Sequence, residues 1–282
     1  MVEHRRFGNL LPHLVLLAGV AIVAFPVYLA VIASTHDNTV IANGQMPLYP
    51  GSHAIETYWN TIVSGTGKTT RAPVGGMMLN SLIMALGIAA GKIAISIISA
   101  YAIVFFSFRF RMTAFWTIFI TLMLPVEVRI FPTYKITSDL HMLDSYAGLI
   151  LPLIASATAT LLFRQFFMTV PKELVEASKI DGAGPIRFFW DTLLPLSVTN
   201  IAALFVILFI YGWNQYLWPL LITTRDDMQT IVIGIKKIID VHDALTEWQV
   251  AMATAVLAML PPVAVVVLMQ RLFVKGLIET EK

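Results

Sequence analysis

Two basic residues lie within or beside long apolar stretches of this 282-residue sequence. Lys92 is the only charged residue between positions 72 and 108, and Arg129 stands at the far end of a later apolar stretch. A cation at membrane depth costs free energy unless a polar cavity, a partner or snorkelling toward water compensates it. Lys92, with Arg129 as a second candidate, therefore either offsets the charge of a bound anion or is a structural or snorkelling lysine.

Four polar or aromatic residues recur at helical spacing in another apolar stretch. Tyr211, Asn214, Gln215 and Trp218 fall at i, i+3, i+4 and i+7, which places them on one face of a continuous helix. Side-chain amides in lipid need a partner from protein or water. The spacing predicts one stripe that either forms hydrogen bonds between helices or lines the path of a solute.

Catalytic and metal-binding patterns are missing from the sequence. Cysteine is absent, which removes thiolate nucleophiles and cysteine-based metal sites. Neither G-x-S-x-G nor H-E-x-x-H occurs, the apolar stretches carry no carboxylate near their centres, and the six histidines show no ligand spacing. We therefore expect no catalytic residue, no metal and no cofactor bound by this chain, and we exclude an intramembrane enzyme.

The composition indicates the elements that must position these residues. Hydrophobic residues make up 57% of the chain and charged residues only 13%, a balance that cannot cover the surface of a soluble domain. Apolar stretches of about 20 residues can cross a bilayer as helices. The prediction is an all-α polytopic membrane protein with six transmembrane helices, at about 12–33, 77–106, 112–131, 147–167, 199–221 and 249–272.

Basic residues near the span ends predict the orientation. With six spans both termini share one side, and the loops of that side carry more Lys and Arg, including Arg5, Arg6, Arg109 and Arg111. Such residues are retained in the cytoplasm, so both termini are expected there. The predicted organisation is an N-terminal helix with an extended extracytoplasmic loop (1–75), a five-helix unit (76–270) and a cytoplasmic tail (271–282).

The cytoplasmic loop of about residues 170–196 is the most informative segment. Pro171 suits the first turn of a helix, Glu173 suits its positive end, and Gly182 can adopt the left-handed conformation that ends it. A second short helix can run from Pro185 to Trp190. The pattern predicts a helix, a glycine turn and a helix on the inner membrane face, either as an interfacial element or as a docking element.

This loop is similar to the E-A-A-x3-G-x9-I-x-L-P signature of ABC importer permeases. Glu176-Ala177-Ser178, Gly182 and Leu194-Pro195 match it, with Ser178 in place of Ala and Thr192 in place of Ile. Further blocks resemble the carbohydrate-type, binding-protein-dependent permeases of this family, and the resemblance extends over nearly the whole chain. These blocks are 119–132, 143–148, 162–167 and 211–219.

The resemblance implies an ABC type I importer permease fold in which the loop helix is a cytoplasmic coupling helix. It implies a complex with a sister permease, two ATPase subunits that use ATP and Mg, and an extracytoplasmic solute-binding protein in a bacterial inner membrane. Carried over by residue, Glu176 would be the polar contact to the ATPase. Ala177 and Ser178 would allow close approach, and Gly182 would form the turn.

The resemblance also suggests a substrate. It is strongest to glycerol-phosphate permeases, so we expect sn-glycerol 3-phosphate, with glycerophosphodiesters as a further candidate. Lys92 and Arg129 would then offset the phosphate charge, and the stripe from Tyr211 to Trp218 would line the path. A permease for maltose-like or other oligosaccharides remains the alternative.

Overall fold

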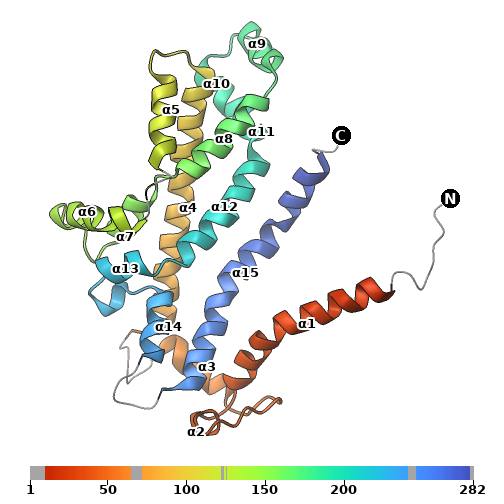
Figure 1. Cartoon of the computed structure of the whole chain (residues 1–282), viewed down its shortest axis with the longest axis vertical. Coiled ribbons are helices and arrows are strands. Elements are labelled where there is room, and N and C mark those ends of the chain that lie inside the picture. Colours follow the sequence, from red (N-terminus) through yellow and green to blue (C-terminus); the bar gives the residue numbers. More distant parts are fainter. Residues whose placement is uncertain (1–9, 65–71, 122–123, 125, 241–245, 280–282) are drawn as a thin grey trace. The chain divides into compact units, whose positions relative to one another are not determined.

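The computed structural model describes residues 10–64, 72–121, 124, 126–240 and 246–279, and every regular element in these ranges is helical (Figure 1). The chain divides into two compact units. Unit 1 contains Met1–Met77 and Ile233–Leu260, and unit 2 contains Met78–Val232 and Pro261–Lys282. Arg5 and Arg6, which support the predicted orientation, lie outside the described residues.

Unit 1 contains the first long helix and a segment that the sequence predicts as an extended loop. Two short helices form in that segment, and the Asp37 side chain caps the first of them, α2, by accepting from the Thr39 amide. The Ser34 and Tyr58 hydroxyls share a hydrogen bond of 2.9 Å. The elements of unit 1 are α1 (Leu10–Ala33), α2 (Asn38–Ala42), α3 (Ala54–Val63), most of α14 (Ile231–Ile239) and the first part of α15 (Trp248–Glu279).

Three helices of the described residues are continuous, apolar and long enough to cross a membrane. They are Pro12–Ala33 in α1, Val74–Phe105, which is α4, and Trp248–Gln270 in α15. They correspond to the first, second and sixth predicted spans. Two bent pairs, Tyr146–Leu153 with Ala157–Thr169 at 49° and Pro185–Leu196 with Val198–Trp213 at 70°, raise the number to five if each pair is one span.

The third predicted span, 112–131, does not form one helix. The chain instead forms α5 (Arg111–Ile120) and α6 (Val126–Asp139). Proline lacks the amide hydrogen that a continuing helix needs, and Pro125 stands just before α6 in the sequence. Glu127 and Arg129 then add charges that an apolar span would not carry.

The fourth and fifth predicted spans are also interrupted. The fourth comprises α7 (Tyr146–Ile150), a 3₁₀ turn (Leu151–Leu153) and α8 (Ala157–Thr169). Ser156 restarts the helix by accepting from the Ala159 amide. The fifth comprises α12 (Val198–Trp213) and α13 (Leu217–Ile222).

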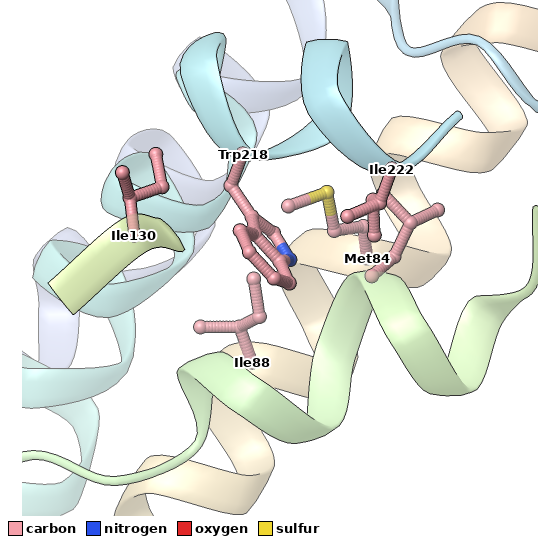
Figure 2. Close-up of a cluster of buried hydrophobic side chains, with 6 residues drawn as sticks. Met84, Ile88, Ile130, Trp218 and Ile222 are labelled. Carbon is pink, nitrogen blue, oxygen red and sulfur yellow. The ribbon is translucent and has the colours of Figure 1, made fainter. Parts of the chain in front are cut away.

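Unit 2 is held together by a cluster of buried side chains around Trp218 (Figure 2). The Trp218 indole is 4% exposed, and its Nε1 donates to the Gly148 carbonyl at 3.1 Å. A side chain at Gly148 would collide with the Met142 carbonyl, so glycine permits this turn. The cluster joins α4, α6, α7 and α13 through Met84, Ile88, Ile130, Leu149, Trp218 and Ile222.

Candidate functional site

The predicted coupling segment begins as a short helix with well-defined ends. α9 (Lys172–Ile180) follows Pro171 and carries Glu173 in its first turn. At its end Gly182 has a φ of 73°, and its amide donates to the Lys179 carbonyl at 3.0 Å. The Ala183 amide donates to the Ser178 carbonyl at 2.9 Å, which completes a Schellman motif. The predicted left-handed Gly182 is therefore confirmed.

α9 packs poorly against the rest of this chain. None of its residues is buried, Glu176 and Ala177 are exposed, and Ser178 is half-buried. Ile180 is 86% exposed. A helix that leaves such surface uncovered is typical of an element that meets a partner or a membrane surface.

The second part of the loop follows the prediction only in its first turn. α10 spans Pro185–Phe188, a π-helical turn spans Phe189–Leu193, and α11 spans Leu194–Leu196. The predicted helix from Pro185 to Trp190 therefore changes its winding at Phe189. Arg187 Nε and Asp191 Oδ2 lie 3.1 Å apart across this change.

A hollow of about 300 Å³, lined by both charged and apolar residues, lies beside α9. Two of the four predicted coupling residues, Ala177 and Ser178, line it. Its other walls include Leu174, Asp181, Arg187 and Asp191. The predicted contact residues therefore border a concave surface that carries both signs of charge.

Aromatic residues anchor this loop to the end of α4, which the sequence reasoning missed. The Tyr101 hydroxyl donates to the Pro185 carbonyl at 2.7 Å. The Tyr101 and Phe189 rings lie 5.0 Å apart, and the Phe105 and Phe188 rings 5.5 Å apart. The sequence shows aromatic residues clustered at the end of α4 and in the coupling loop, but which rings pair with each other depends on tertiary structure. The anchor joins α10 and the π-helical turn, which follow α9 in the chain, to the end of α4.

The structure brings two of the predicted path residues together. Lys92 on α4 is 7% exposed, and its Nζ lies 3.8 Å from the centre of the Tyr211 ring on α12. Arg129 on α6 is exposed, and it carries the same positive charge as Lys92. Among the described residues, no carboxylate pairs with either cation.

The predicted stripe on one helix is wrong. α12 ends at Trp213 with Asn214 as its cap, and α13 begins at Leu217. Pro219 explains the break, because a helix that continued through it would lose a backbone hydrogen bond, whereas the first turn of a new helix does not. The side-chain amide of Gln215 donates a hydrogen bond to the Tyr211 carbonyl at 3.0 Å. Trp218 belongs to the buried cluster instead (Figure 2).

Asp144 joins two loops through hydrogen bonds to Thr224 and Arg225, and we call this contact the Asp144 latch. The sequence did not predict it. Its carboxylate accepts from the Thr224 amide at 2.6 Å, the Thr224 hydroxyl at 2.5 Å and the Arg225 amide at 2.9 Å. Burial alone would raise the pKa of Asp144, but the Thr224 and Arg225 hydrogen bonds outweigh it and lower that pKa. Asp144 has a φ of 50°, an unusual conformation for this residue type.

Within the described residues, no group of three or more metal-ligating side chains comes together. The candidate functional features of the described residues are the exposed helix α9 and the buried Lys92 on the Tyr211 ring. Neither feature supplies a nucleophile paired with a base.

Comparisons with known proteins show the family of the chain. Residues 92–279 match the family model of the binding-protein-dependent transport system inner membrane component. The chain is 59% identical over 282 residues to the sn-glycerol-3-phosphate transport system permease protein UgpE of Agrobacterium fabrum. It is 58% identical to that of Brucella melitensis and 56% identical to that of Escherichia coli O157:H7, with all of each chain covered.

A solved structure supports the fold. The chain resembles a bacterial ABC transporter involved in the import of the acidic polysaccharide alginate, with a TM-score of 0.80 and 18% identity. The match covers 96% of this chain and 98% of that one. The chain therefore belongs to the family of binding-protein-dependent transport system inner membrane components.

Proposed function

We propose that this chain is the permease subunit of an ATP-driven importer and that, with a sister permease, it forms the path for sn-glycerol 3-phosphate. The observation that carries the substrate is the 56–59% identity over the whole length to permeases named for it. Glycerophosphodiesters, which carry the same charged group, are a further candidate substrate. As a member of its family, the chain is a multi-pass inner-membrane transport component and not an enzyme.

The partners in this proposal are a sister permease, two ATPase subunits that bind ATP and Mg, and an extracytoplasmic solute-binding protein. α9 would dock on an ATPase subunit, with Glu176 as the polar contact and Ala177 and Ser178 allowing close approach. Its uncovered surface and the adjacent hollow support this role. The Tyr101 anchor would then transmit the motion of α9 to α4.

The proposed topology has six spans and cytoplasmic termini, with the third, fourth and fifth spans interrupted. The proposed domains remain residues 1–75, 76–270 with the coupling loop at about 170–196, and 271–282. A reporter fusion after Lys282 tests the orientation. Cytoplasmic reporter activity is expected, whereas an active alkaline phosphatase fusion at that position would reject the topology.

The proposed path includes Lys92, Arg129, Tyr211, Asn214 and Gln215. Asn214 and Tyr211 are exposed, and the two cations could offset a phosphate charge. Trp218 is left out of the path because its indole is buried and hydrogen-bonded within the core of unit 2.

Uptake by the reconstituted complex tests the substrate. Vesicles that contain both permeases and the ATPase, supplied with the binding protein and ATP, should accumulate sn-glycerol 3-phosphate and not maltose. Uptake of maltose alone would favour the alternative, an oligosaccharide permease.

A further inference from the structure

Lys92 is a buried cation whose described surroundings do not neutralise it. Its side chain is 7% exposed, and its Nζ lies 3.8 Å from the centre of the Tyr211 ring. No hydrogen bond or carboxylate partner to Lys92 occurs among the described residues. The face of an aromatic ring attracts a cation, but it replaces only part of the lost hydration.

Arg129, on α6, would add a second positive charge to the proposed path and therefore cannot neutralise Lys92. A purely structural lysine in an apolar helix is expected to pair with a carboxylate or to extend toward water. Lys92 instead lies on a ring and has no carboxylate partner among the described residues.

We infer that Tyr211 is a positioning residue for phosphate recognition: its ring holds Lys92 in the path until a phosphate monoester takes the ammonium group over. The inference rests on the proposed function and deepens it. A phosphate oxygen accepts a charge-assisted hydrogen bond, which is stronger than the contact with the ring. A neutral oligosaccharide brings no charge and cannot replace the ring in the same way.

An aromatic ring and a carboxylate would affect Lys92 in different ways. A carboxylate beside Lys92 would neutralise it permanently and would repel the incoming phosphate. The ring keeps Lys92 in place and charged without doing either. Ring and lysine should therefore act as one unit, so that removing the ring matters only while the lysine is present.

A double-mutant cycle on the reconstituted complex tests this coupling, with sn-glycerol 3-phosphate as the probe. Lys92→Met should raise the concentration for half-maximal uptake by about tenfold or more. Tyr211→Leu should raise it by about threefold to tenfold, and Tyr211→Phe, which retains the ring, should restore it to near the wild-type value. The double variant should be no worse than Lys92→Met alone.

Matched controls separate this effect from damage to the fold. Phe205→Leu exchanges an aromatic ring on the same helix that contacts Phe209, and it should leave half-saturation unchanged. Maximal ATP hydrolysis and copurification with the ATPase should be unchanged in all variants. If Lys92→Met does not assemble, the contrast between Tyr211→Leu and Tyr211→Phe, together with retained affinity in Lys92→Arg, carries the test.

Two results have different meanings. Normal half-saturation in Lys92→Met, or independent and multiplicative effects of the two single changes, would overturn the inference and leave the glycerol-phosphate importer intact. Failure of the wild-type complex to take up sn-glycerol 3-phosphate, with uptake of maltose instead, would overturn the proposed function together with the inference.

Discussion

α9 and the cluster around Trp218 differ in how far they pack against the rest of unit 2. α9 is defined by its own neighbours in sequence, from Pro171 to the Schellman motif at Gly182, and it buries none of its residues. The Trp218 cluster joins residues from four helices and leaves almost none of its surface exposed. The difference indicates that one region keeps the fold and the other is available to a partner.

The largest expected effect is a loss of stability in the buried cluster. Trp218→Ala should remove about 3 to 5 kcal/mol of stability, because it leaves a cavity and an unpaired Gly148 carbonyl. Thermal unfolding of the purified complex measures it. Trp190→Ala, at a 60% exposed tryptophan of the coupling loop, is the matched control and should cost far less. Equal losses of stability in Trp218→Ala and Trp190→Ala would show that the buried cluster does not stabilise the fold more than the coupling loop does.

A smaller effect is expected at the end of α9. Gly182→Val should cost about 1 to 2 kcal/mol locally, because φ at this position is 73°. Nothing obstructs a side chain there, so the cost is conformational. Faster hydrogen exchange in the last turn of α9 and reduced uptake should follow.

The neighbouring glycine provides the control for this change. Gly184 has an ordinary φ of −71° and equally open surroundings, so Gly184→Val should be tolerated. Similar exchange rates and uptake in the two variants would show that the left-handed turn is unimportant.

The anchor between the coupling loop and the end of α4 should contribute less again. Tyr101→Phe keeps the ring contacts with Phe189 and removes the hydrogen bond to Pro185, which is worth about 1 kcal/mol. Hydrogen exchange in residues 185–193 should become faster while the rest of unit 2 is unchanged. Unchanged exchange in this segment would argue against the anchor.

The smallest expected effect concerns the Asp144 latch and depends on pH. Because its hydrogen bonds lower the pKa of Asp144, the stabilisation is fully present above the unfolded pKa of about 4 and is lost as pH falls through the folded pKa. Asp144→Asn should lower the unfolding temperature slightly at neutral pH, and the difference from wild type should shrink on acidification. A difference that grows at low pH would contradict this account.

Local and long-range contacts explain which features could be predicted. The ends of α9 follow from Pro171, Glu173 and Gly182, whose effects act within a few residues. The lengths of the apolar stretches predicted where helices occur, but not their continuity, because hydrophobicity does not reflect the helix breaks that Pro125 and Pro219 favour. Lys92 and Tyr211 were each selected from sequence, yet their contact spans more than a hundred residues and required the structure.

The most direct test of the account is whether the exposed surface of α9 couples this chain to ATP hydrolysis. Glu176→Lys should abolish ATP-dependent uptake of sn-glycerol 3-phosphate and weaken copurification with the ATPase, while membrane insertion stays normal. Glu56→Lys, the same exchange at an exposed glutamate of α3, should leave copurification unchanged. Normal uptake and normal copurification in Glu176→Lys would contradict the proposed role of α9.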